Sequence, residues 1–328
     1  MHPLRIMTFN VENMLERFDF KRFKKEHGND ASDFERHIDR DRQFRTYWKF
    51  LDDNSRDFTA LAIRDARPDI VCLQEVESLR ALRAFDDKYV RPICDLDFRH
   101  KLLIEGNDGR GINVGVMSRL AMDTAATHQA STCRDLDFDP PGKLQPDERI
   151  FRRDCLELRI EHEGRPLTLF ICHFKSMSGT RRRTRPVRQA EAKAVRRIIE
   201  RRFPDPANAD WLIAGDLNDY TETDGEPDQE HGLGALIDGG FSVDLVKRIP
   251  DPMARWTHYY AGDRSYHQLD YLLASPALAA RNKDAVPTVI RAGQPGRAER
   301  YTGKRFPKIG WKRPKASDHC PVVVELLL

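Results

Sequence analysis

Short apolar runs that meet acids, amides or histidines at one end recur along this 328-residue chain. An apolar run of four or five residues is typical of the buried part of a sheet, and the polar residues beside it mark the end of the strand. The polar clusters are Thr8-Phe9-Asn10, Leu73-Gln74-Glu75, His173-Phe174-Lys175-Ser176, Gly215-Asp216-Leu217-Asn218, Leu269-Asp270-Tyr271 and Ser317-Asp318-His319. The pattern favours a fold in which several strand ends converge on one polar site.

The apolar runs predict eight strands, over residues 4–11, 69–74, 111–117, 156–160, 167–173, 211–215, 269–273 and 321–328. Residues 156–160 alternate with period two, and a Gly-Arg-Pro turn leads from them into 167–173, so these two strands should form a hairpin. Helices are predicted over 61–66 and 188–202. Strands interrupted by helices favour an α/β fold in which mixed sheets are covered by helices.

Two segments depart from this pattern. Residues 14–58 are rich in charged and aromatic side chains without strand alternation, and we interpret them as an insertion with a helix around Asp41–Leu51. Residues 293–315 are rich in proline, glycine and lysine and predict a long loop, which in a compact domain is more often functional or mobile than inert. No linker divides the chain, so we expect a single domain over residues 1–328.

The composition argues against a membrane protein. Apolar residues make up 40% of the chain, and no run approaches the roughly 18 apolar residues that a membrane span requires. The segment Met1–Arg5 lacks the apolar core of a cleaved signal peptide, so we expect a cytoplasmic protein whose six cysteines are free thiols. The sequence leaves the oligomeric state open, and a monomer is the simplest expectation.

The net charge of +3 conceals an uneven distribution. Residues 181–202 hold ten Arg or Lys and two acids, and residues 297–315 hold eight Arg or Lys and one acid. Two basic segments on an otherwise acidic chain predict a patch that faces a polyanion. The alternative is that one segment is a solvated helix face and the other a solvated loop.

Several clusters place chemically useful side chains at strand ends. Glu75 follows a buried run, where a carboxylate is costly unless it is paired or bound to a metal. Asn10 ends the first predicted strand, where its amide would orient a carboxylate or metal-bound water, or simply close a turn. Asp216 and Asn218 are two residues apart and share a face, which suits the holding of a water or an oxyanion.

Two histidines complete the candidate set. His173 and Lys175 are also two residues apart on a predicted strand and should point to the same face. Asp270 lies within a strand-like run, and a buried aspartate beside a histidine would fix the tautomer of that histidine. His319 is the candidate partner for Asp270.

Taken in this order, the six clusters resemble the endonuclease/exonuclease/phosphatase superfamily. This group includes exonuclease III-like and pancreatic-type deoxyribonucleases, inositol polyphosphate 5-phosphatases and neutral sphingomyelinases. The matching elements run from Thr8 to His319 and cover nearly the whole chain. The resemblance implies a four-layer αββα sandwich of two packed mixed β-sheets flanked by helices, with the site at one edge. It also implies hydrolysis of a phosphoester with Mg²⁺ or Mn²⁺, which prefer oxygen ligands.

The resemblance assigns roles to individual residues. Glu75 is expected to hold the metal, with Asn10 and Asp318 completing or tuning its shell. His319 either activates water as a general base or stabilises charge as an imidazolium, and the sequence does not choose between these roles. Asp216 is expected to position or deprotonate the water, or to protonate the leaving group.

The remaining positions concern the substrate. Asn218 and His173 are expected to donate hydrogen bonds to phosphoryl oxygens. The resemblance implies that Arg153 contacts the substrate phosphate or a carboxylate of the site, and the alternative is a salt bridge to Asp154 or nearby acids. Lys175 either adds phosphate affinity or is solvated.

The substrate class is predicted from the charge pattern. The two basic segments and the aromatic residues near 301–311 favour a nucleic-acid phosphodiesterase. A small phosphoester, of inositol phosphate or nucleotide type, or a lipid headgroup is the alternative, although we find no apolar hairpin that would engage a membrane. The long insertion and the His-Phe-Lys-Ser motif depart from the exonuclease III pattern and argue against abasic-site repair. An inactive nucleic-acid-binding module is disfavoured because every expected catalytic residue type is present.

Overall fold

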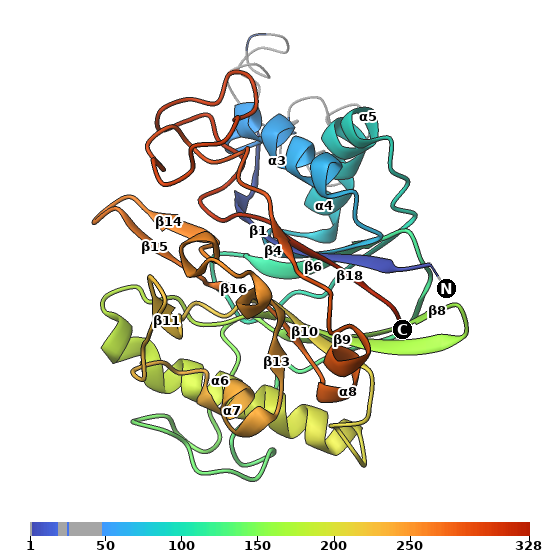
Figure 1. Cartoon of the computed structure of the whole chain (residues 1–328), viewed down its shortest axis with the longest axis vertical. Helices are drawn as coiled ribbons and strands as arrows, with labels where there is room; N and C mark the ends of the chain where they lie inside the picture. Colours follow the sequence, from blue (N-terminus) through green and yellow to red (C-terminus); the bar gives the residue numbers. More distant parts are fainter. Residues whose placement is uncertain (1, 19–24, 26–47) are drawn as a thin grey trace.

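The computed structural model describes residues 2–18, 25 and 48–328. Two six-stranded sheets dominate it (Figure 1). The first sheet has the spatial order β17 (Thr288–Val289), β18 (Val322–Leu326), β1 (Leu4–Met14), β4 (Ile70–Val76), β6 (Asn113–Ser118) and β5 (His100–Leu103). The second has the order β13 (Val243–Asp244), β16 (Asp270–Ala274), β10 (Trp211–Asp216), β9 (Arg165–His173), β8 (Cys155–His162) and β7 (Met122–Thr127).

The two sheets share one plan. Each contains a single parallel pair at its centre, β1 with β4 in the first sheet and β9 with β10 in the second. An antiparallel strand, β18 or β16, lies on the far side of one member of each pair. All other strand pairs of the two sheets are antiparallel, which makes both sheets mixed, as predicted.

Side-chain alternation along the strands builds three apolar layers. Leu4 and Ile6 of β1 point between the sheets, where they pack with residues of β9, β10 and β16. Met7 and Phe9 of the same strand point to the outer face, against α3. The third layer covers the outer face of the second sheet, where Trp211 is fully buried under helix α6 and its neighbours. The predicted four-layer αββα sandwich is therefore confirmed.

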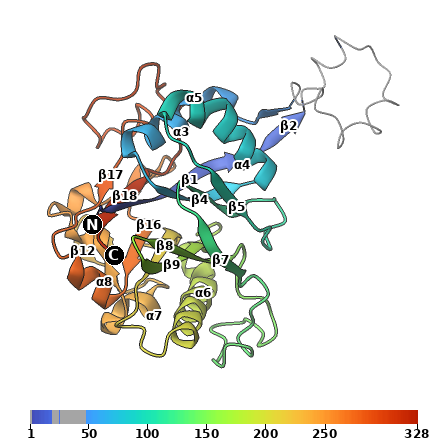
Figure 2. The ribbon, with the colours of Figure 1, turned by 90° about the vertical axis from the view of Figure 1, so that its right-hand side faces the viewer.

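Helices cover each outer face. Helices α3 (Asp53–Ala66), α4 (Leu79–Phe85) and α5 (Arg91–Cys94) lie over the first sheet, with a π-helical turn, η2 (Asp86–Val90), between the last two (Figures 1 and 2). Helices α6 (Arg181–Arg202) and α7 (Gly234–Ile237) lie over the second sheet. Helix α8 (Pro276–Arg281) follows β16. Among the residues that the structure describes, no helix combines the length and the apolar character needed to cross a membrane.

The smaller elements are hairpins and short helical turns. The hairpins are β2 (Glu16–Phe18) with β3 (Trp48–Phe50), β11 (Glu222–Thr223) with β12 (Glu226–Pro227), and β14 (His258–Tyr260) with β15 (Ser265–His267). The 3₁₀ turns are η3 (Asp238–Gly240), η4 (Leu245–Arg248) and η5 (Pro252–Ala254). The predicted loop over 293–315 contains no helix or strand.

Three helix predictions need correction. The helix expected over 61–66 is the last part of α3, which begins at Asp53. The helix expected around Asp41–Leu51 lies mostly outside the described residues, and its last part is wrong because 48–50 forms strand β3. The helix expected over 188–202 begins seven residues earlier, at Arg181, where Thr180 caps it by accepting a hydrogen bond from the Arg183 amide. Pro186 lies inside this helix. A proline in the early turns of a helix removes few hydrogen bonds, which is compatible with the earlier start.

Candidate active site

The parallel pair of each sheet delivers its polar residues to the same edge. In the first sheet, Asn10 pairs with Gln74, directly before Glu75. In the second sheet, Asp216 pairs with His173. Because carboxyl ends of parallel strands lie at one edge of a sheet, these four positions form two facing rows. The antiparallel neighbours begin there too, so that Asp270 starts β16 and His319 precedes β18.

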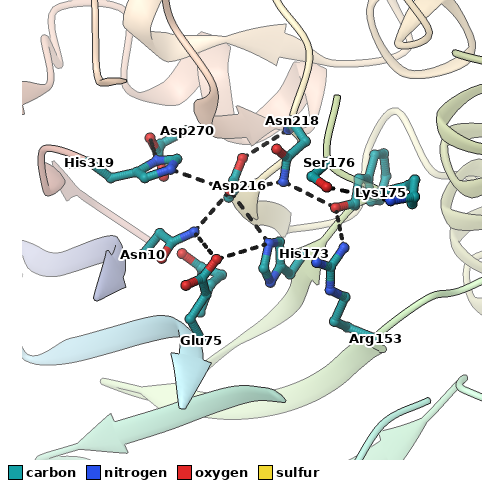
Figure 3. Close-up of polar contacts among 12 residues, drawn as sticks. Asn10, Glu75, Arg153, His173, Lys175, Ser176, Asp216, Asn218, Asp270 and His319 are labelled. Carbon is teal, nitrogen blue, oxygen red and sulfur yellow. Dashed lines mark hydrogen bonds and ion pairs between the residues drawn. The ribbon is translucent and has the colours of Figure 1, made fainter. Parts of the chain in front are cut away.

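Asp216 lies at the centre of the site and is 1% exposed (Figure 3). Its Oδ2 accepts hydrogen bonds from the amides of Asn10 and Asn218, both at 3.0 Å, and Oδ1 accepts one from the Asn218 backbone at 2.9 Å. The Nε2 of His173 lies 3.5 Å from Oδ2. Burial is the main cause that raises the pKa of Asp216, to about 7, while His319 opposes the rise.

His319 forms a buried pair with Asp270. Its Nδ1 lies 2.8 Å from Oδ2 of Asp270, and its Nε2 lies 3.7 Å from Oδ2 of Asp216. Thr257 donates a second hydrogen bond to Asp270 Oδ2 at 2.7 Å, which fixes the orientation of the carboxylate. Burial alone would lower the pKa of His319, but the charges of Asp270 and Asp216 outweigh it and raise that pKa well above its usual value. The imidazolium is therefore the favoured form of His319.

Glu75 connects the first sheet to this centre. Its Oε1 accepts a hydrogen bond from Asn10 at 3.3 Å and lies 3.9 Å from Nε2 of His173. Its Oε2 accepts a 2.8 Å hydrogen bond from the backbone of Asn13. Glu75 has φ of +68°, at the place where the pairing of β4 with β6 shifts register. This irregularity turns the Glu75 carboxylate out of the ladder and toward Asn10.

The donor set fits a hard divalent cation. The candidate ligand atoms of Asp216, Asp270 and His319 all lie within 4.8 Å of one another, but His319 offers none to a cation in its imidazolium form, so the carboxylates are the donors. The Oδ1 of Asp270 is buried and has no hydrogen-bond partner within the part of the chain that the structure describes. Glu75 adds a further carboxylate, a ligand type that Mg²⁺ and Mn²⁺ prefer, while the Asn10 Oδ1 accepts a hydrogen bond from the Glu12 backbone. Buried carboxylates in such number are stable only with compensating positive charge.

Asp318 does not contact these candidate metal donors in the described residues. Within the described residues, no hydrogen bond or ion pair joins its carboxylate to Glu75 or Asn10, and its Oδ1 accepts only a long, 3.4 Å hydrogen bond from Ser317. Lys315 is the main charge that lowers the pKa of Asp318, against the opposing effect of burial.

Arg153 and Lys175 occupy different environments. Arg153 is 2% exposed, lies 3.0 Å from Asp108 through Nε, and donates to the Phe174 carbonyl at 2.8 Å. This geometry favours the ion-pair alternative, with Asp108 as the partner instead of Asp154. Lys175 is half-buried, and its ammonium donates to Ser176 at 3.5 Å (Figure 3). Burial, together with the charge of Arg153, lowers the pKa of Lys175.

Sequence reasoning missed the residues that brace the loops of the site. Asp219 is fully buried and accepts hydrogen bonds from Arg188 at 2.8 Å and Arg181 at 2.6 Å. Glu191, also fully buried, accepts from the backbone amides of Lys175 and Arg152 at 2.7 and 3.2 Å. Helix α6 thus holds both loops, the one after β9 and the one after β10. A signal was present for Glu191, because an acid within so basic a segment needs a partner.

These contacts change the interpretation of the two basic segments. Arg181, Arg188 and Arg202 of α6 form ion pairs with acids elsewhere in the chain. In the loop, Arg300 pairs with Asp224, and Arg313 pairs with Glu12 and Asp52. Within these two segments, seven exposed cations take part in no ion pair or side-chain hydrogen bond with the described residues: Arg182, Arg183, Lys193, Arg201, Lys304, Lys308 and Lys312. The patch available to a polyanion is therefore smaller than the sequence suggests.

Comparisons with known proteins agree with this fold. Residues 7–319 match the family model of the Endonuclease/Exonuclease/phosphatase family. None of the curated proteins matches the chain. Among solved structures, an endonuclease/exonuclease/phosphatase protein from Beutenbergia cavernae is 16% identical, with a TM-score of 0.56 over 100% of this chain and 72% of that one. TDP2 from D. rerio, complexed with a single-strand DNA product, is 16% identical with a TM-score of 0.53, and 99% of each chain is covered.

A third structure, the human Nocturnin catalytic domain with a bound sulfate anion, is 14% identical with a TM-score of 0.53. The match covers 99% of this chain and 94% of that one. At such identities the similarity to solved structures establishes the fold alone. The family model covers all six polar clusters, from Thr8 in β1 to His319. The chain belongs to the endonuclease/exonuclease/phosphatase family.

Proposed function

We propose that this chain is a divalent-metal-dependent phosphodiesterase that hydrolyses nucleic-acid phosphodiester bonds. Family membership supports a hydrolase of phosphoesters. The observation that carries the proposal is the position of Asp216, which is buried between two amides and two histidines at an edge where both sheets meet. Such a group of fixed donors around one carboxylate suits the attack of water on a phosphorus centre.

Glu75 would hold Mg²⁺ or Mn²⁺, with Asn10 completing or tuning its shell, while Asp216 stays free for proton transfer. When bound, the cation polarises the phosphoryl group and stabilises charge on the leaving oxygen. The residues of the chain supply the remaining functions.

Asp216 accepts the proton of the attacking water. Its pKa of about 7 matches a general base that works near neutral pH. As the water oxygen bonds to phosphorus, the ester bond breaks and the leaving oxygen takes a proton from solvent. His319, which its two carboxylate neighbours keep protonated, stabilises negative charge on the phosphoryl oxygens. This assignment selects the imidazolium role for His319 over the general-base role.

Asn218 and His173 orient the reacting groups. The Asn218 amide donates to Asp216 at 3.0 Å and to the Phe174 carbonyl at 3.1 Å, so it is held at both ends. Burial lowers the pKa of His173 well below its usual value, with Arg153 as the next cause. A neutral His173 can donate one hydrogen bond from Nε2, toward Asp216 or toward a phosphoryl oxygen.

Two observations bear on the substrate. Exposed Lys304, Lys308 and Lys312 lie on the same loop as Trp311, which is 60% exposed, and this combination suits phosphate contacts and base stacking. The structural likeness to a TDP2 that was solved with single-strand DNA also supports nucleic acid. The second candidate, a small phosphoester, is favoured by the internal ion pairs of Arg181, Arg188 and Arg202.

A hydrolysis panel tests the proposal. The substrates are supercoiled plasmid, single-stranded DNA, RNA, inositol phosphates and bis-p-nitrophenyl phosphate, each with Mg²⁺, with Mn²⁺ and with EDTA. We expect metal-dependent cleavage of nucleic acid that Asp216→Asn lowers by at least roughly 10²-fold. The exposed Asp139→Asn serves as the matched control and should retain full turnover. Turnover of inositol phosphates with intact plasmid, DNA and RNA would replace the nuclease by a small-molecule phosphatase.

A further inference from the structure

Two loops of the second sheet are joined within the candidate active site. The loop after β9 contains Phe174 and Lys175, and the loop after β10 contains Asn218 and Asp219. The Asn218 amide joins them, because it donates to the Phe174 carbonyl at 3.1 Å and to Oδ2 of Asp216 at 3.0 Å (Figure 3). The orientation of the Asn218 amide, and with it the environment of Asp216, therefore depends on the distance between the two loops.

Arg188 of α6 joins the same two loops a second time, behind the site. Its Nε donates to Oδ2 of Asp219 at 2.8 Å, and its Nη1 donates to the Lys175 carbonyl at 3.2 Å. Lys175 directly follows Phe174, and Asp219 directly follows Asn218. The bridge through Arg188 is therefore one residue away from the bridge through Asn218 in each loop.

The guanidinium of Arg188 is itself held in place. It is fully buried, and it also donates to the Thr184 hydroxyl at 2.7 Å and to the Arg181 carbonyl at 2.9 Å. Gly232 packs against the Arg188 side chain so closely that an added Cβ would lie 2.9 Å from the Cβ of Arg188. The Gly232 amide donates to the same Asp219 oxygen at 2.8 Å. A planar guanidinium fixed on several sides is a rigid spacer between the loops.

Arg181 provides a comparison within the same helix. Its Nε lies 2.6 Å from Oδ1 of Asp219, and its other side-chain hydrogen bonds go to the Tyr220 carbonyl and the Asp228 carboxylate. All three acceptors lie within residues 219–228. In the part of the chain that the structure describes, no hydrogen bond or ion pair joins the Arg181 side chain to the loop after β9. Of the two arginines that bind Asp219, Arg188 alone spans both loops.

We propose that Arg188 is a positioning residue for phosphodiester hydrolysis, which fixes the distance between the two loops and thereby orients Asn218 toward Asp216. This inference rests on the proposed function, because one of its readouts is turnover. Arg188 is fully buried and contacts none of the candidate metal donors among the described residues, so it acts through Asn218. Its loss should lower kcat and leave KM almost unchanged, as for an interaction that matters only in the transition state.

Steady-state kinetics of the full chain with bis-p-nitrophenyl phosphate and Mn²⁺ is the first test. We expect Arg188→Met to lower kcat by at least roughly 10-fold, with KM within about twofold of the wild-type value. Arg181→Met removes a cation from the same Asp219 but no bond to the loop after β9, and it should lower kcat by less than about threefold. Equal losses in the two variants, or a change in KM alone, would overturn the inference.

A double-mutant cycle tests whether Arg188 acts through Asn218. Asn218→Ala removes the bridge within the site, so that adding Arg188→Met to it should lower kcat by less than about threefold more. If the two losses multiply instead, Arg188 does not act through Asn218 and the inference is wrong.

Hydrogen–deuterium exchange provides a readout that does not require turnover. Arg188→Met should speed exchange in peptides from both loops, 173–180 and 216–222, whereas Arg181→Met should speed it only in the second. If Arg188→Met does not fold, Arg188→Lys replaces it in every measurement, since it keeps a positive charge beside Asp219 but lacks the planar fork. A response of one loop alone to the Arg188 variant would contradict the bridge. A wild type that hydrolyses neither bis-p-nitrophenyl phosphate nor nucleic acid would overturn the proposed function and this inference with it, whereas an active wild type with an unaffected Arg188 variant would overturn the inference alone.

Discussion

At the residue scale, burial separates arginines that support the fold from those that can meet a ligand. The family resemblance predicts that Arg153 contacts the substrate phosphate or a carboxylate of the site. Its guanidinium instead pairs with Asp108, donates a hydrogen bond to the Phe174 carbonyl and is almost fully buried. Phe174 directly follows His173, and its carbonyl also accepts from Asn218. Arg153 therefore acts on the site through the backbone between β9 and the loop that follows.

Replacement of Arg153 distinguishes the two roles. We expect Arg153→Met to lower the free energy of unfolding by about 1–3 kcal/mol, because it removes a charged donor from the buried Phe174 carbonyl, whereas Asp108 keeps its ion pair with Arg110. Urea denaturation of the variant and of the wild type measures this difference. The exposed Arg182→Met is the matched control and should change stability by less than about 0.5 kcal/mol. A stable Arg153→Met with a raised KM would return Arg153 to substrate binding.

At the element scale, helix α6 shows what could be predicted from the sequence and what could not. Its apolar stripe of alanine, valine and isoleucine correctly predicted a helix packed on a sheet. Its basic residues suggested an outer face for a polyanion, yet Arg181 and Arg188 point to Asp219. Propensity and periodicity report which face is apolar, but the partner of a buried charge depends on tertiary packing.

The same limit applies to the strand ends. The polar residues at the ends of β1, β4, β9 and β10 were predicted to converge, and the structure brings Asn10, Glu75, His173 and Asp216 together. The pairing of Glu12 with Lys315, 303 positions apart, had no local signal. Strand ends are predictable because a buried sheet imposes an apolar pattern, whereas an ion pair between a bulge and a loop leaves no periodic trace.

Glu191 of α6 gives a prediction on pH dependence. Burial raises its pKa from 4.5 to about 7 although two backbone amides bond to it. A carboxyl group with a raised pKa in the folded state stabilises the fold fully below pH 4.5, and this contribution is lost as the pH rises to about 7. The loss amounts to about 3 kcal/mol.

We expect Glu191→Gln to remove this pH-dependent loss, since the amide cannot ionise. Urea denaturation of both proteins between pH 5 and 8 measures the effect, and the stability of the wild type should fall relative to that of the variant. Glu200→Gln, on the same helix and partly exposed, is the control and should follow the wild type. Parallel pH curves for Glu191→Gln and the wild type would contradict the assignment.

At the scale of the whole molecule, the two sheets are equivalent halves that each bring one edge to the site. Neither half contains the site alone, because Glu75 and Asn10 come from the first sheet and Asp216 and His173 from the second. The loop over 293–315 lies beside this edge, since Arg313 and Lys315 bond to Glu12 (Figure 1). That the chain is one domain with an insertion at 14–58 remains a prediction.

The position of this loop leads to a test of the substrate class. Lys304, Lys308 and Lys312 are exposed on the loop. Lys283 is also exposed, but it follows α8, and α8 follows the end of β16 that is remote from Asp270. The salt dependence of plasmid binding is the slope of log K against log[salt]. If all three loop lysines contact phosphates of a duplex, their joint replacement by alanine should reduce the magnitude of this slope by about 3. Turnover of bis-p-nitrophenyl phosphate, which is too small to reach them, should stay unchanged. Lys283→Ala is the control and should leave both quantities at the wild-type value. An unchanged slope in the triple variant would mean that duplex DNA does not cross this loop, and would strengthen the small phosphoester as the substrate.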